Sequence, residues 1–106
     1  MSSLQDEQYT YELDRDRAEK AYFDQLKEEG IPCVVGSSML LSAMRQPGPH
    51  TAEEICTIIN TANTTHKISK LLAAKFLNYQ HILGNVTEIK PGKYELYLIE
   101  PWFGLA

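Results

Sequence analysis

The sequence predicts one small α+β domain that is mainly helical, with four helices followed by a β-hairpin. Apolar residues recur at helical spacing in four segments, and turn-forming residues separate these segments. After Gly84 the spacing changes to the alternation that is typical of strands. A chain of 106 residues, of which 43% are hydrophobic and 23% are charged, has room for one domain with a modest core.

The first helix is expected over residues 13–29. Its apolar face has residues at four-residue spacing, namely Ala18, Tyr22 and Leu26. Gly30 ends this helix, and Pro32 prevents it from resuming. Residues 1–12 are polar and are expected to form a flexible N-terminus, and residues 31–36 form a connector or a short strand.

A second, shorter helix is expected over residues 38–46. Ser37 or Ser38 can cap its first turn, because a serine hydroxyl accepts a hydrogen bond from a free backbone amide. The sequence Pro-Gly-Pro at 47–49 ends it, since proline lacks the amide hydrogen that a continuing helix needs.

Two further helices are expected over residues 52–61 and 65–79. Thr51 and Glu54 have the spacing of a capping box, in which each side chain bonds the backbone amide of the other residue. The apolar residues of the later helix share one side: Ile68, Leu71, Leu72, Phe76 and Tyr79.

The C-terminal part is expected to form a β-hairpin over residues 85–99. Pro91 and Gly92 suit the two central positions of a type II turn, since glycine tolerates the positive φ that the second position requires. The tail at 101–106 is short and apolar.

The order of these elements, together with one run of residues, resembles the winged helix-turn-helix superfamily. The run is Met-Leu-Leu-Ser-Ala-Met-Arg-Gln-Pro-Gly-Pro-His-Thr-Ala-Glu-Glu-Ile at 39–55. The resemblance implies a winged helix-turn-helix domain over residues 37–100, in which the hairpin is the wing. The amphipathic helix with its connector at 13–36 and the tail at 101–106 lie outside it.

By this resemblance, the helix at 65–79 would be the recognition helix, whose first turns enter the major groove of DNA, and residues 90–93 would be the tip of the wing. The resemblance thus implies a DNA-binding transcriptional regulator with double-stranded DNA as its partner. The residues expected to contact DNA are polar or basic: Thr64, Thr65, His66, Lys67, Lys70, Lys90 and Lys93.

The net charge of −4 is unevenly distributed along the chain. Residues 1–30 carry nine acidic and four basic side chains, whereas residues 64–93 carry five lysines and one glutamate. A local positive charge attracts phosphates even when the whole chain is acidic. The clustering of the lysines therefore favours binding of nucleic acid over a merely solvated surface.

A protein-interaction module is the alternative interpretation. Ala73 and Leu77 are predicted to form an apolar strip on the recognition helix, and the tail adds Trp102 and Phe103. The recognition helix also has no arginine, asparagine or glutamine before Asn78, and these are the usual readers of base edges. In this interpretation the winged helix is an assembly scaffold that does not bind nucleic acid.

A homodimer is expected in either case. A domain of this size with an added amphipathic helix and an apolar C-terminus hides that surface more easily by pairing. A dimer would also match the palindromic half-sites of many DNA operators.

Other function classes find little support. His50, His66 and His81 have no helical pairing with one another or with a cysteine, so no metal is expected. Cys33 and Cys56 lack C-x-x-C spacing and are expected to be buried thiols in a reducing compartment, cytoplasmic or nuclear. No secretory signal is recognised, and no apolar run is long enough to cross a membrane. We therefore expect a binding protein without cofactors rather than an enzyme.

Overall fold

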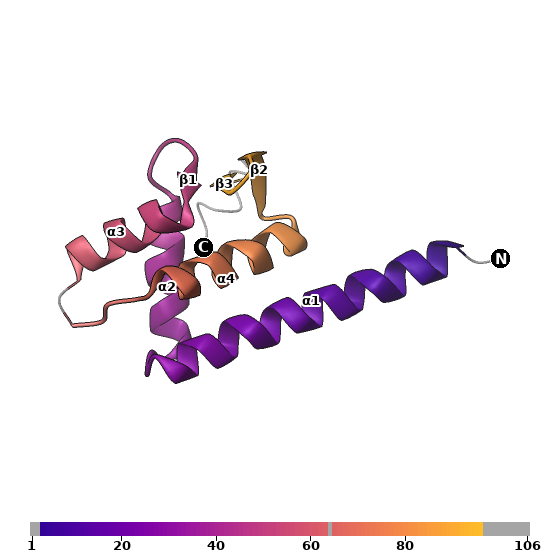
Figure 1. Ribbon diagram of the computed structural model, residues 1–106, viewed down its shortest axis with the longest axis horizontal. Helices are drawn as coiled ribbons and strands as arrows, with labels where there is room; N and C mark the ends of the chain where they lie inside the picture. Colours follow the sequence, from indigo (N-terminus) through magenta and orange to yellow (C-terminus); the bar gives the residue numbers. More distant parts are fainter. Residues whose placement is uncertain (1–2, 64, 97–106) are drawn as a thin grey trace.

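The computed structural model describes residues 3–63 and 65–96, with side chains from residue 11 onward (Figure 1). Its elements follow the chain in the order α1 (Ser3–Glu28), α2 (Cys33–Met44), β1 (His50–Thr51), α3 (Ala52–Ala62), α4 (Lys70–Leu83), β2 (Val86–Lys90) and β3 (Lys93–Leu96). The described chain is thus mainly helical with one small antiparallel sheet, which confirms the predicted α+β class.

Helix α1 is longer than the sequence predicts. It begins at Ser3, so the expected flexible segment 1–12 is helical from that residue on. Residues 3–12 contain neither proline nor glycine, so a polar composition alone does not break the helix. Figure 1 shows α1 running along α4 and extending past its end, away from the rest of the molecule.

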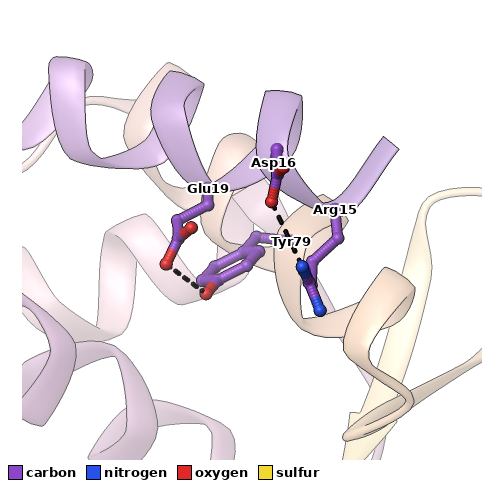
Figure 2. A network of polar contacts seen from close by, with 4 residues as sticks. All are labelled: Arg15, Asp16, Glu19 and Tyr79. Carbon is purple, nitrogen blue, oxygen red and sulfur yellow. Dashed lines mark hydrogen bonds and ion pairs between the residues drawn. The ribbon is translucent and has the colours of Figure 1, made fainter. Parts of the chain in front are cut away.

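The contacts between α1 and α4 show that the two helices run antiparallel. Tyr79 Oη donates a hydrogen bond to Glu19 Oε2 at 3.2 Å, next to the local Arg15–Asp16 ion pair (Figure 2). Nearer the other end, Lys75 Nζ donates to an oxygen of the Gln25 side chain at 2.9 Å. Aromatic rings fill the space between: the ring centroids of Phe76 and Tyr79 lie 5.5 and 5.9 Å from that of Tyr22.

Helix α2 begins at Cys33, earlier than the predicted start at residue 38. Pro32 precedes it as the N-cap, and neither serine caps it. Ser37 Oγ instead shares a hydrogen bond with Tyr22 Oη at 2.9 Å. Gly36 lies inside the helix and is buried, because it is the point where α2 passes closest to Leu26 of α1. The segment expected as a connector therefore supplies the first turn of a helix.

The capping box at the start of α3 is confirmed. Thr51 Oγ1 accepts from the Glu54 amide at 3.1 Å, and the Thr51 amide donates to Glu54 Oε1 at 2.9 Å.

Helix α4 begins at Lys70, so the predicted start at residue 65 is wrong. Asn60 explains the difference, because its side chain accepts from the Ile68 amide at 2.8 Å and donates to the Ile68 carbonyl at 2.9 Å. This pairing consumes the groups that a helix would need at that residue. Ser69 then caps α4 by accepting from the Leu72 amide at 3.0 Å.

The sheet has the order β1-β3-β2, and both pairings are antiparallel. The hairpin is confirmed as far as Leu96, and the positive φ of Gly92 (80°) is the one that the second central position of a type II turn requires. Residues 97–99 of the predicted hairpin and the tail 101–106 lie outside the described residues. Strand β1 was not predicted, since two residues carry no periodicity.

The core lies around α4, which packs against α1 on one side and against α3 and the sheet on the other. The fully buried side chains come from all four helices: Tyr22, Leu26, Leu40, Met44, Ile55, Leu72, Phe76 and Leu77. A helix that is covered on two sides keeps only a narrow exposed face.

Candidate nucleic-acid interface

The exposed face of α4 consists of five residues: Lys70, Leu71, Ala74, Asn78 and His81. They follow a spacing of three or four residues, so they lie along one side of the helix. This face carries a lysine, an asparagine and a histidine, and no acidic side chain. Ala74, in its middle, is small enough to let another molecule approach the helix closely.

The loop before α4 holds three of the predicted DNA-contacting residues. Thr65 and Lys67 are exposed and His66 is half-buried, whereas Thr64 lies outside the described residues. These residues precede the helix and do not form its first turns, which corrects their predicted place. The loop is fixed at its far end, where the Ile68 carbonyl also accepts from the Cys56 thiol at 3.3 Å.

The N-terminus of α4 is occupied by a carboxylate from the chain just beyond α1. Glu29 accepts from the Ser69 amide at 3.0 Å, and its other oxygen accepts from the Ser69 hydroxyl. A negative charge there stabilises the helix dipole. The amide of Ser69 is therefore not available to a phosphate.

The hairpin presents the remaining two lysines on either side of its turn. Lys90 is exposed, Lys93 is half-buried, and the two residues are paired across the strands. Glu88 Oε2 accepts from the Gly92 amide at 3.0 Å and so holds the turn. The hairpin is joined to the end of α4, where the rings of His81 and Tyr94 meet edge to face with centroids 5.6 Å apart.

Burial, together with the nearby Glu88 carboxylate, raises the pKa of Tyr94. This phenol therefore stays neutral beside the Glu88 carboxylate.

The predicted lysines thus form two pairs. Lys67 and Lys70 lie at the start of α4, and Lys90 and Lys93 lie on the hairpin that follows its end. A helix of 14 residues is about 21 Å long. That length is shorter than one turn of duplex DNA, about 34 Å, so a single short duplex is long enough to span both pairs.

The predicted apolar strip on α4 is wrong. Ala73 is 0% exposed and Leu77 is 1% exposed, so both belong to the core. The prediction assumed that only one side of α4 is covered. In the structure α1 covers a second side, so the exposed face is the one that carries Asn78 and His81. Trp102 and Phe103 lie outside the described residues.

Sequence reasoning did not include Asn78 and His81, which lie on the exposed face of α4, among the candidate residues. The sequence did contain a signal: Asn78 follows Ala74 by four residues, and His81 follows Asn78 by three. It could be interpreted only once the helix start was known, because the face of a helix cannot be assigned without its register against the core.

The two cysteines differ from expectation. Cys33 is exposed, so its predicted burial is wrong, and Cys56 is half-buried; both are free thiols. Burial, with the neighbouring Glu29 carboxylate, raises the pKa of Cys56, and its thiol remains a hydrogen-bond donor. His50 is buried and donates from Nε2 to the Gln46 carbonyl at 3.0 Å.

In the part of the chain that the structure describes, no three His, Cys, Asp or Glu side chains come together as a metal site would require. No described helix is both long and apolar enough to span a membrane. Comparisons of the chain with protein-family models, with curated proteins and with solved structures found no match.

Proposed function

We propose that this chain binds double-stranded DNA through the exposed face of α4 and the hairpin, and that it acts as a transcriptional regulator. The observation that carries the proposal is the composition of that face. Of its five residues one is basic and two can hydrogen-bond in the plane of a base edge, and none is acidic. Lysines continue it at both ends of the helix.

The topology supports a winged helix-turn-helix scaffold for this function. Helices α2, α3 and α4 are followed by the hairpin, and β1 lies between α2 and α3 and pairs with β3. In such domains the helix before the hairpin enters the major groove and the hairpin lies beside it. Helix α4 is therefore the proposed recognition helix.

The chemistry of the face assigns roles to Asn78, Ala74 and the lysines. Asn78 can make a bidentate contact with the N6 and N7 atoms of adenine, and Ala74 can contact a thymine methyl group. The four lysines would meet phosphates, which position the protein without reading sequence. Burial of Ala73 and Leu77 removes the part of the interaction-module alternative that lay on α4.

The electrostatic part of the proposal is tested by titrating the protein with duplex DNA of mixed sequence at several salt concentrations. Each phosphate contact contributes about −0.9 to the slope of log affinity against log salt. Lys70→Ala is expected to weaken binding for all sequences and to reduce the slope by about one contact. Lys20→Ala, on the exposed part of α1 and outside the proposed surface, is the matched control and should change the slope by much less than one contact.

The sequence-reading part is tested with Asn78→Ala on a panel of duplexes. We expect a loss of preference between adenine and other bases at one position, corresponding to about 1–3 kcal/mol, with little change in the salt slope. If the wild-type protein shows no duplex binding even at low salt, the proposal is wrong.

A further inference from the structure

A second surface lies at the corner where the end of α1 meets the start of α2, away from the hairpin (Figure 1). An apolar hollow of about 380 Å³ opens there, lined by Phe23, Leu26, Lys27, Ile31 and Cys33. Phe23 is 40% exposed at this surface. Apolar surface that gathers in one place on a domain is a candidate interaction site.

A protruding side chain stands beside the hollow. Val34 follows Cys33 in the first turn of α2 and is 80% exposed, which makes it the most exposed large hydrophobic side chain among the described residues. The surface thus combines an apolar projection with an apolar hollow of its own. That combination is what a two-fold symmetric interface requires, because residue i of one copy must contact residue j of the other, and j must contact i.

The charges around the hollow are self-complementary as well. Lys27 lines the hollow and forms no ion pair within the described residues. Glu28, the next residue on the same helix, is exposed, whereas the Asp24 carboxylate already pairs with Lys20 at 2.8 Å. In a two-fold arrangement the Lys27 ammonium of each copy can therefore meet a carboxylate of the other copy.

We propose that this surface binds a second copy of the chain in a symmetric dimer, with Val34 of each copy in the hollow of the other. The dimer does not depend on the proposed DNA binding, since the two surfaces share no residue. If both proposals hold, the dimer carries two α4 faces, one for each half of a two-fold symmetric DNA site.

The first experiment locates the interface through Cys33, which lines the hollow and is exposed. The full chain is treated with a short bismaleimide reagent, which joins two thiols by thioether bonds. Cys56→Ser, which keeps Cys33, is expected to give a covalent dimer at low protein concentration. The matched variant Cys33→Ser, which keeps the half-buried Cys56, is expected to remain a monomer on a denaturing gel.

The second experiment uses sedimentation of the untreated protein across a concentration series. The wild-type chain is expected to sediment at twice its mass of 12.0 kDa, and Val34→Asp at the monomer mass. Val34 is so exposed that this change leaves the fold intact, which far-UV circular dichroism checks. Ile89→Asp, at a hydrophobic residue that is 49% exposed on β2, is the matched control and should leave the dimer unchanged.

Three results would overturn the inference. One is a wild-type chain that stays monomeric up to near-millimolar concentration. Another is equal dissociation by Val34→Asp and Ile89→Asp. The third is equal cross-linking through Cys33 and through Cys56. None of these results bears on DNA binding, which the titration with duplex measures separately.

Discussion

At the scale of single residues, Tyr22 of α1 is a side chain that contacts both α2 and α4. It is 1% exposed, its hydroxyl bonds Ser37 on α2, and its ring packs on Phe76 and Tyr79 of α4. The sequence identified it as part of the apolar face of the first helix. Its hydrogen bond could not be predicted, because Ser37 was interpreted as a helix cap.

Burial raises the pKa of Tyr22 to about 12, against an ordinary value of 10.0. The folded state therefore favours the neutral phenol more than the unfolded state does. The resulting contribution to the unfolding free energy is fully present below pH 10 and is lost as the pH rises from 10 to about 12. A shift of about two pKa units corresponds to at most about 2.7 kcal/mol of unfolding free energy.

We predict that Tyr22→Phe removes most of this alkaline loss, measured by urea unfolding at a series of pH values. At neutral pH the variant should lose about 0.5–1.5 kcal/mol for the missing hydrogen bond. Ser37→Ala loses the same bond but keeps the buried phenol, so its stability should still fall between pH 10 and 12. Parallel curves for wild type and Tyr22→Phe would contradict the assignment.

At the scale of elements, the start of α3 is decided by a local signal and the start of α4 by tertiary contacts. The start of α3 depends on Thr51 and Glu54 alone, and it was predicted correctly. The start of α4 depends on Asn60, eight residues before Ile68, and on Glu29, forty residues before Ser69. Contacts of that separation have no signature in a single sequence.

Gly36 shows the same limit within α2. Because glycine disfavours a helix, it was interpreted as the end of the connector. In the structure its lack of a side chain allows α2 to pack closely on α1. A methyl group at this position would overlap Leu26 Cδ2 and lie 3.2 Å from Ile31 Cγ2. Leu26 must therefore shift, and Ile31 Cγ2 would still be in tighter contact with the added methyl group than packed side chains normally are.

We predict that Gly36→Ala destabilises the protein by about 1–2 kcal/mol, since overpacking of about 1–3 kcal/mol exceeds the gain in helix propensity of up to about 1 kcal/mol. Ser38→Ala, at an exposed position of the same helix, is the control and should be neutral or slightly stabilising. Thermal or chemical denaturation measures both. A stabilised Gly36→Ala would mean that α1 and α2 are farther apart than the structure shows.

At the scale of the whole molecule, the charge division along the sequence is kept only in part, because Glu29 of the acidic segment bonds Ser69 beside Lys70. The acidic residues of the first thirty lie mostly on α1, whereas four of the five lysines of residues 64–93 lie around the proposed DNA-binding surface. The exception is Lys75, which bonds Gln25 of α1. The sequence predicted this charge division and the class of fold, but not that α1 covers a side of α4.

The acidic charge of α1 leads to a prediction about long-range electrostatics. The prediction rests on the proposed DNA binding. Asp14 and Asp16 are exposed on α1 and belong to neither proposed surface. Their charges should repel the phosphates at low salt, where screening is weak, and should have no effect once the Debye length is short.

We therefore predict that the double variant Asp14→Asn/Asp16→Asn binds duplex DNA a few-fold more tightly than wild type at about 50 mM salt and equally at about 300 mM. Lys70→Ala should behave differently, because a lost phosphate contact weakens binding at low salt and makes the dependence on salt shallower. Fluorescence anisotropy with one labelled duplex can measure all three proteins side by side. An affinity gain that persists unchanged at high salt would indicate a direct contact of these aspartates with DNA, and no gain at low salt would place α1 too far from the duplex to be sensed.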